Sequence, residues 1–245
     1  NSGDCGNYHG LVVSAPEDGS APSTFVVANL PGDKQGAVWM GGAAPVIDAQ
    51  GDIWVSTGNS AYSSSNSQYD NSDGVLKLSP TASLLDHFTP LNWYSDNAAD
   101  SDLGSTSPTL LPNGLVFAVG KSLTGYVLQQ SPLGGVGGQV AATPGFCGNE
   151  AQGGSAQSAG TVYVPCSDGL RAVTPTTTAP VQLWKSTSGA RSSPIVAGGL
   201  VWSMGGGVLY AVDPSTGQQA QSFDLGGQTT HFPSPAAADG LVIAP

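Results

Sequence analysis

The stretch that decides the fold is SPIVAGGLVWSMGGGVLYAVDPSTG, residues 193–217. A Ser-Pro pair opens it, and three apolar runs follow that are separated by turns containing Gly. Short apolar runs bounded by Gly and Pro are typical of β-strands that are covered on both faces. In the closing turn, Asp213 is expected to cap backbone amides and Gly217 to adopt a positive φ. The stretch therefore predicts antiparallel strands joined by tight turns.

The same unit recurs along the chain. The second residue of its opening pair stands at positions 45, 108, 156, 194 and 235, so the spacings are 63, 48, 38 and 41 residues. A period near 40 residues is typical of a blade of four short antiparallel strands in a β-propeller. We therefore predict an all-β propeller whose four full blades span approximately residues 43–105, 106–152, 153–192 and 193–233.

The two ends of the chain each supply half a blade, at residues 1–42 and 234–245. Either the two halves pair and close a five-bladed ring, or the chain is part of a larger ring. Because the chain begins with Asn1 and ends directly after the apolar run at 241–244, we expect a processed or incomplete chain.

Composition and charge exclude several classes of function. The 245 residues include 6 basic and 17 acidic side chains, which gives a net charge of −11. A chain this acidic repels phosphate backbones and anionic lipids, so nucleic acid is not an expected partner. No apolar run approaches the roughly 18 residues that a membrane span needs. Only 9% of residues are charged, so neutral polar groups keep the surface soluble, which favours a secreted protein in an extracellular or periplasmic setting.

Cys147 and Cys166 lie 19 positions apart around a loop rich in Gly and Ser. We predict a disulfide between them, which would stabilise the fold by about 3 kcal/mol. The alternative is a pair of buried free thiols. Cys5 then is free or has a partner outside the chain. The chain has no Cys-x-x-Cys and its three His are scattered, so local spacing does not support a zinc site.

The strand and Asp-x-x-Thr-Gly turn at 207–217 resemble the repeat of pyrroloquinoline-quinone (PQQ) dehydrogenases and their non-enzymatic relatives. The resemblance covers about residues 36–245. Thr57-Gly58-Asn59 is similar to a family motif whose Asn ligates calcium. The loop at 100–105 resembles the one that carries the catalytic aspartate, with Asp102 as the better match. Lys121 resembles the basic residue that contacts the quinone oxygens.

This resemblance implies a PQQ- and calcium-dependent alcohol oxidoreductase, acting on a small or polymeric alcohol. Asn59 and Asp102 would ligate calcium, Asp102 would also act as the base, and Asn59 and Lys121 would bind the cofactor. The residue types suit the chemistry, because calcium prefers oxygen ligands and a cation stabilises charge on a reduced quinone. The form Asp-x-Asp-Leu-Gly-Ser is closer to a secreted bacterial branch related to polyvinyl-alcohol dehydrogenases.

The sequence also departs from this family. The adjacent Cys-Cys pair of the family is absent, and neither the carboxylate that completes its calcium site nor the tryptophan beneath its quinone is identified. In the alternative interpretation, Asn59 is a turn residue, Asp102 caps a loop and Lys121 is a solvated lysine. The chain would then be a non-catalytic binding or scaffold propeller for a protein or glycan partner.

Three further candidates are weaker. The loop at 70–74 carries calcium-type ligands without the spacing or closing Glu of an EF-hand. Asp96, Asp100 and Asp102 would suit a carboxylate pair of the glycosidase kind. Trp93 lies in a predicted loop beside these acids and is a candidate ligand contact.

Overall fold

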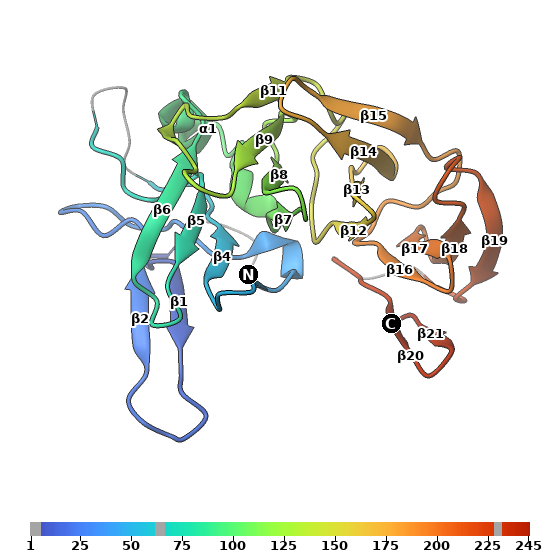
Figure 1. Ribbon diagram of the computed structural model, residues 1–245, viewed down its shortest axis with the longest axis horizontal. Helices are drawn as coiled ribbons and strands as arrows, with labels where there is room; N and C mark the ends of the chain where they lie inside the picture. Colours follow the sequence, from blue (N-terminus) through green and yellow to red (C-terminus); the bar gives the residue numbers. More distant parts are fainter. Residues whose placement is uncertain (1–5, 62–66, 228–231) are drawn as a thin grey trace.

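The computed structural model describes residues 6–61, 67–227 and 232–245, and it is an all-β propeller arrangement, as the sequence predicts. Four sheets of antiparallel strands follow one another along the chain. In Figure 1 they radiate from a common centre, with β7, β12 and β16 towards the inside and β6, β15 and β19 outside. Within each blade, the first strand in the sequence therefore lies nearest the centre and the last strand lies farthest from it.

The strands of each blade are as follows. Blade 1 contains β3 (Val46–Ile47), β4 (Ile53–Ser56), β5 (Val75–Leu78) and β6 (Leu84–Thr89). Blade 2 contains β7 (Thr109–Leu110), β8 (Leu115–Val119), β9 (Gly125–Gln129) and β11 (Ala141–Thr143). Blade 3 contains β12 (Ala156–Ser158), β13 (Thr161–Val164), β14 (Arg171–Pro175) and β15 (Pro180–Lys185). Blade 4 contains β16 (Ile195–Ala197), β17 (Leu200–Gly205), β18 (Val208–Val212) and β19 (Gln219–Asp224).

One strand crosses between blades, which the repeat did not predict. β10 (Gly135–Val136) leaves blade 2 and pairs in parallel with β6, as a fifth strand of the blade 1 sheet. The backbone N–H of Leu133 donates to the Asp86 carboxylate at 2.8 Å, just before this strand. Blades 1 and 2, which carry the predicted site residues, are thus tied together at their outer edge.

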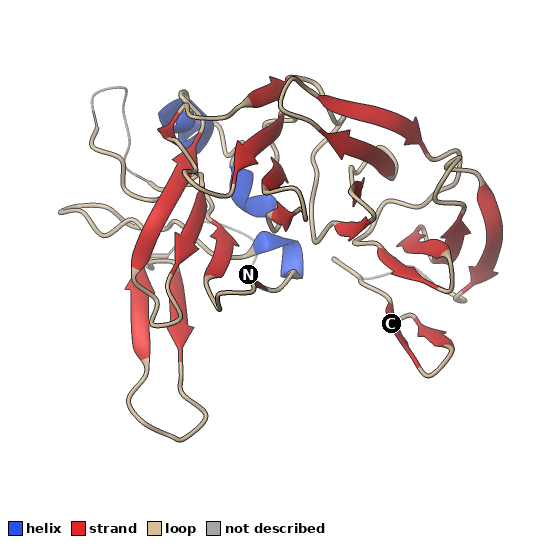
Figure 2. Ribbon diagram, in the orientation of Figure 1, coloured by secondary structure: helices blue, strands red, loops and turns tan. Residues whose placement is uncertain are grey.

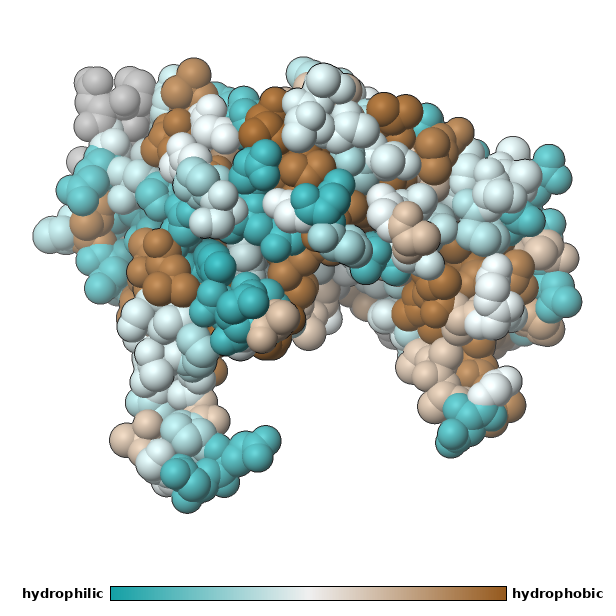
Figure 3. Space-filling view, in the orientation of Figure 1, coloured by the Kyte–Doolittle hydropathy of each residue, from teal (hydrophilic) through white to brown (hydrophobic). Residues whose placement is uncertain are grey.

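The two half-blades are separate sheets of two strands each. β1 (Leu11–Ser14) pairs with β2 (Ser23–Val26), and β20 (Ala236–Ala238) pairs with β21 (Leu241–Ile243). The sequence left open whether the half-blades pair to close a five-bladed ring. In this structure they do not pair with each other, and they end opposite sides of an open arc (Figure 1). Figure 3 shows a wide hollow between these ends. Cys5 lies outside the described residues.

Among the described residues, helical structure is limited to three short segments, which are drawn blue in Figure 2. They are the 3-10 turns η1 (Met40–Gly42) and η2 (Leu103–Ser105) and the helix α1 (Trp93–Ala98). In the part of the chain that the structure describes, no helix is long and apolar enough to cross a membrane. All three segments belong to the connections that enter blades 1 and 2.

The hydrophobic core consists of layers between adjacent blades. Val116 and Leu128 of blade 2 pack with Trp54 and Val75 of blade 1, while Phe117 on the opposite face packs with Val164 of blade 3. Because each sheet is covered on both faces, its central strands are continuous apolar runs rather than alternating ones. This explains the apolar runs on which the blade prediction depends.

Turn chemistry agrees with the sequence at the closing turn of blade 4. The Asp213 carboxylate accepts hydrogen bonds from the backbone N–H groups of Ser215 and Thr216, at 2.8 and 3.0 Å. Gly217 has φ +72°. A Cβ at this position would lie 2.6 Å from the Trp184 ring, so both the backbone conformation and the close approach require Gly.

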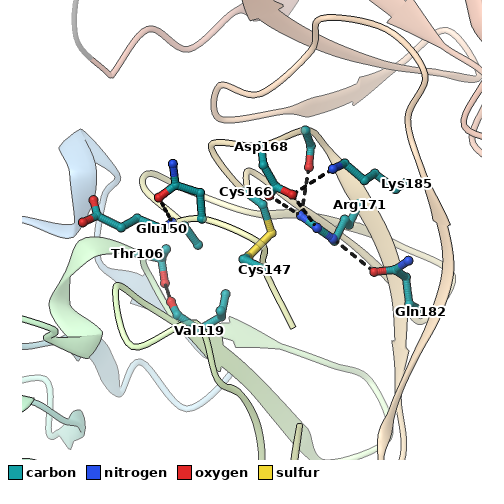
Figure 4. Close-up of a disulfide and its surroundings, with 12 residues drawn as sticks. Thr106, Val119, Cys147, Glu150, Cys166, Asp168, Arg171, Gln182 and Lys185 are labelled. Carbon is teal, nitrogen blue, oxygen red and sulfur yellow. Dashed lines mark hydrogen bonds and ion pairs between the residues drawn. A yellow bond between two sulfur atoms is a disulfide. The ribbon is translucent and has the colours of Figure 1, made fainter. Parts of the chain in front are cut away.

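The predicted disulfide between Cys147 and Cys166 is present, and both residues are completely buried in the layer between blades 2 and 3. In Figure 4 it lies beside an ion-pair cluster of blade 3. There the Arg171 guanidinium donates two hydrogen bonds to Asp168, at 2.7 and 2.8 Å, and Lys185 approaches the same carboxylate at 2.8 Å. A disulfide is consistent with folding in an oxidising compartment.

Candidate functional site

The centre of the candidate site is an ion pair between Lys121 and Asp102. Lys121 follows β8 after one residue, Gly120, and Asp102 immediately precedes η2. Lys121 Nζ lies 3.2 Å from Oδ2 of Asp102 and 2.7 Å from Oδ1 of Asp100. The backbone N–H of Lys121 also donates to the carbonyl of Asp102 at 3.0 Å. Sequence reasoning placed both residues in one site, and the structure brings them into direct contact.

The surroundings keep this lysine charged. Burial acts to lower the pKa of the Lys121 ammonium, but the charges and hydrogen bonds of Asp102 and Asp100 outweigh it and raise the pKa. The Asp102 side chain is completely buried, whereas the Asp100 side chain is 64% exposed. Of the two ion pairs of Lys121, the one with Asp102 is therefore the stronger, because solvent screens the one with Asp100.

The Thr57-Gly58-Asn59 turn lies on the same side, at the end of β4. Thr57 Oγ1 donates to the carbonyl of Asn71 at 2.7 Å and accepts from the N–H of Gly74 at 3.1 Å. The carbonyl of Asn59 accepts from the N–H of Gly36 at 2.8 Å. Asn59 is half-buried, and its position is fixed by hydrogen bonds on both sides of the turn.

Backbone contacts bring this turn against the Asp102 loop. A Cβ at Gly104 would fall on the backbone of Thr57 and Gly58, and one at Gly120 would lie 2.6 Å from Cα of Leu103. Neither Gly has a positive φ, so close approach rather than backbone conformation is what requires a glycine at these two positions. Two glycines thus place the Asn59, Asp102 and Lys121 segments against one another.

Trp39 adds an aromatic face to the site. It immediately precedes η1, and Lys121 Nζ lies over its ring, 5.2 Å from the centroid. A Cβ at Gly58 would lie 3.2 Å from Trp39 Nε1, so the indole also packs close to the Asn59 turn. A cation at this distance over an indole is a favourable arrangement. Sequence reasoning did not identify Trp39, because only tertiary contacts join it to Lys121.

A buried carboxylate, Asp73, joins the two loops. Its backbone N–H donates to the carbonyl of Gly58 at 3.0 Å, and its Oδ1 accepts from the N–H of Leu103 at 2.6 Å. The residue is 1% exposed. Burial raises the pKa of Asp73 well above its usual range, and the charges of Asp96, Asp102 and Asp70 raise it further. Four carboxylates therefore face one another in blades 1 and 2.

The weaker sequence candidates have structural explanations. Asp70 accepts from the N–H and hydroxyl of Ser72, at 3.0 and 2.5 Å, and so shapes its own loop. Asp96 accepts from the Asn92 amide at 2.9 Å, and burial raises its pKa to about 6. Trp93 begins α1, is 5% exposed and packs edge-on against Tyr69. Packing in this cluster leaves the Trp93 ring little exposed surface for a ligand.

An axial pocket of about 300 Å³ lies close to Trp39. Phe232 lines it and also contacts the Trp39 ring edge-on, with centroids 5.7 Å apart. Six of its residues belong to the opening pairs of successive repeats, namely Ala44, Ser107, Ser155, Ser193, Pro194 and Ser234. No charged side chain lines the pocket within the described ranges. It offers hydroxyl and backbone groups at the point where the blades converge.

The donor set suits calcium and a planar anionic ring. Asn59, Asp73 and Asp102 supply oxygen atoms of the kind that calcium prefers. Among residues 6–61, 67–227 and 232–245, no group of three or more His, Cys, Asp or Glu side chains could hold a metal ion. Calcium binding here would therefore use amide and carbonyl oxygens beside two carboxylates. Trp39 offers an aromatic face, and the Lys121 ammonium lies over that face.

The comparisons with known proteins support the fold. No protein-family model and no curated protein sequence matches the chain. Two solved structures that resemble it are quinohemoprotein alcohol dehydrogenases. One is ADHIIG from Pseudomonas putida HK5, with a TM-score of 0.68 and 11% identity over 96% of this chain and 52% of that one. The other is from Comamonas testosteroni, with a TM-score of 0.58 and 15% identity over 85% of this chain and 44% of that one.

A computationally designed protein, Ika8, is also similar, with a TM-score of 0.56 and 13% identity over 96% of this chain and 64% of that one. The chain thus spans between 44% and 64% of the lengths of these three proteins. At identities this low, the similarity to these structures shows the fold alone. It agrees with the arrangement of blades about an axis that the strand order shows.

Proposed function

We propose that the chain forms part of a quinoprotein-type alcohol oxidoreductase that uses PQQ and calcium. The observation that carries the proposal is the Lys121–Asp102 ion pair, at 3.2 Å, under the Trp39 ring and beside the Thr57–Asn59 turn. The disulfide supports an extracellular or periplasmic location for such an enzyme.

The side chains would divide the work as follows. Asn59 and Asp102 would hold calcium, and the face of Trp39 would support the flat cofactor. Lys121 stays protonated beside Asp102 and Asp100, so it can stabilise negative charge on the cofactor oxygens. When bound, the quinone would be the oxidant and would take two electrons and one proton from an alcohol. Asp102 would accept the other proton, that of the hydroxyl group.

The axial pocket supports a neutral, hydroxylated substrate. Its lining carries serine hydroxyls and no charged side chain among the described residues, so it suits an alcohol or polyol better than an ion. Phe232 lines the pocket and contacts the Trp39 ring, which supports the pocket as the substrate site of the proposed enzyme.

Cofactor binding tests this proposal directly. The purified chain would be titrated with PQQ in the presence of calcium, following the quenching of tryptophan fluorescence, and then assayed with alcohols and an artificial electron acceptor. We expect binding at micromolar concentrations that Trp39→Ala weakens by on the order of tenfold, the loss of about one aromatic contact. Trp202→Ala is the matched control, because Trp202 stacks on Phe223 in blade 4. Absence of PQQ binding, or equal binding by both variants, would contradict the proposal.

The same pocket favours a second candidate, a non-catalytic propeller that binds a glycan partner. Serine hydroxyls and backbone groups at the axis are suitable partners for sugar hydroxyls. A chain that binds oligosaccharides but not PQQ would support this function over the enzyme.

A further inference from the structure

Asp73 belongs to the loop at 70–74, whose residue types suit calcium but whose spacing fits no EF-hand. It lies at the end of the loop before β5, and it connects to both loops that carry the proposed calcium ligands. Its N–H donates to the Gly58 carbonyl, next to Asn59, and its Oδ1 accepts from the Leu103 N–H, next to Asp102. The two hydrogen bonds measure 3.0 and 2.6 Å, so the residue is held between the two loops, by its backbone on one side and by its carboxylate on the other.

The second oxygen of this carboxylate has no partner. Oδ2 of Asp73 is buried and makes no hydrogen bond to any described residue. Water does not reach it from the surface either, because the residue is only 1% exposed. A buried carboxylate oxygen without a partner is costly and calls for an explanation such as a bound ion. Its place between the Asn59 and Asp102 loops indicates where that ion would lie.

The local charge balance points in the same direction. Asp70, Asp73 and Asp96 are all buried, and none of them takes part in an ion pair within the described part of the chain. The ammonium of Lys121 is shared between Asp100 and Asp102. A divalent cation would stabilise the ionised forms of these buried acids, and calcium suits the oxygen-rich surroundings.

We infer that Asp73 is a calcium ligand, which supplies the second carboxylate of a site formed with Asp102 and Asn59. The inference rests on the calcium centre of the proposed function and adds a residue to it. The Leu103 N–H orients Oδ1, and Oδ2 is the atom that binds the ion. The alternative is that Asp73 is a protonated side chain with a structural role only.

Calcium titration calorimetry on the chain, after removal of bound metal with EGTA, tests the inference without any assay of activity. In Asp73→Asn the side-chain oxygen can still accept from the Leu103 N–H, but the charge of the ligand is lost. We expect the calcium dissociation constant to rise by on the order of tenfold or more, since ligand charge sets calcium affinity. Asp73→Ser, which also retains an acceptor oxygen, is a second variant in case the first does not fold.

Asp96→Asn is the matched control. Asp96 is a buried acid of the same cluster, and its Oδ1 is held by Asn92 rather than by a loop of the site. A ligand role predicts that calcium affinity falls much further in Asp73→Asn than in Asp96→Asn. Equal losses would show that only net charge matters and would overturn the inference.

Two other outcomes separate this inference from the proposed function. Unchanged affinity in Asp73→Asn, with calcium bound by the unaltered chain, would overturn the role of Asp73 and leave the calcium centre standing. No calcium binding by the unaltered chain would overturn both. As an independent readout, calcium should raise the thermal midpoint of the unaltered chain and of Asp96→Asn more than that of Asp73→Asn.

Discussion

Lys121 Nζ lies 3.2 Å from Oδ2 of Asp102, whose side chain has no exposed surface. The two residues come from different connections, one after β8 and the other before η2, and their backbones are also joined by a hydrogen bond of 3.0 Å. The pair therefore fixes the relative position of two loops as well as their charge. A buried carboxylate in this setting depends on its cation, since loss of one partner leaves an uncompensated charge.

The first prediction concerns this ion pair. We expect Lys121→Met to lower the free energy of unfolding by about 3 kcal/mol, because Asp102 would remain buried without its cation. The double variant Lys121→Met with Asp102→Asn should recover most of this loss. Urea unfolding of the three proteins at pH 7 measures it. Lys77→Met, which affects a separate ion pair with Asp52 in blade 1, is the control; additive effects of the two site substitutions would contradict the coupling.

The second prediction concerns the close approach of Gly104 to the Thr57–Gly58 backbone. A Cβ in Gly104→Ala would meet backbone atoms that cannot move independently, so we expect a loss of about 2 kcal/mol in the free energy of unfolding. Gly227→Ala is a matched control, because nothing lies within 4 Å of a Cβ there. Thermal unfolding of both variants distinguishes crowding at the site from a general effect of Gly replacement.

The third prediction concerns the disulfide. The bond closes a loop between residues 19 positions apart, so its removal by Cys147→Ala and Cys166→Ala should destabilise the chain by about 3 kcal/mol. Unfolding by urea with and without reductant gives the same comparison on the unaltered chain. If thiol alkylation of the unfolded chain labels Cys147 and Cys166 without prior reduction, the bond is absent in solution.

The fourth prediction concerns pH. The side-chain hydrogen bonds of Arg171 hold the pKa of Asp168 well below its usual value of 3.8, with Lys185 acting in the same direction. The ionised carboxylate therefore stabilises the fold fully above about pH 4, and this contribution is lost as the pH falls through the lowered pKa. The difference in unfolding free energy between the unaltered chain and Asp168→Asn should be constant from pH 7 to about 4 and shrink below it.

Asp18→Asn serves as the comparison for this pH series. The pKa of Asp18 is also lowered, by hydrogen bonds from Ser20, but the group is fully exposed and has no ion pair. We expect only a small effect of this substitution at any pH. A difference for Asp168→Asn that stays constant down to pH 2 would contradict the linkage to Arg171.

The blade pattern was readable from the sequence because it depends on local physics. Apolar runs such as 208–212 must be covered on both faces, and turns such as 213–217 require an amide cap and a Gly with positive φ. Apolar runs separated by Gly turns recur along the chain and so predicted the strands and their order. The pairing of β10 with β6 was not predictable in this way, because it joins Gly135 to Phe88 through a contact between blades.

The candidate site was readable only in part. Motif resemblance identified Asn59, Asp102 and Lys121, and the structure shows Lys121 and Asp102 in direct contact. Trp39 matches no motif and has no local signal of its own. Asp73 belongs to the loop at 70–74, which carries calcium-type ligands but whose spacing fits no EF-hand, so its signal was weak.

The sequence by itself determined that the chain forms repeated antiparallel sheets, since the period and turn residues leave few other ways to bury its apolar runs. Only the tertiary structure decided that the Asp73 carboxylate lies between the Asn59 and Asp102 loops, that Lys121 reaches the Trp39 ring, and that the two half-blades remain separate. The physical reason is that these features depend on contacts between segments far apart in the chain. Burial and charge pairing are fixed there by the packing of whole blades.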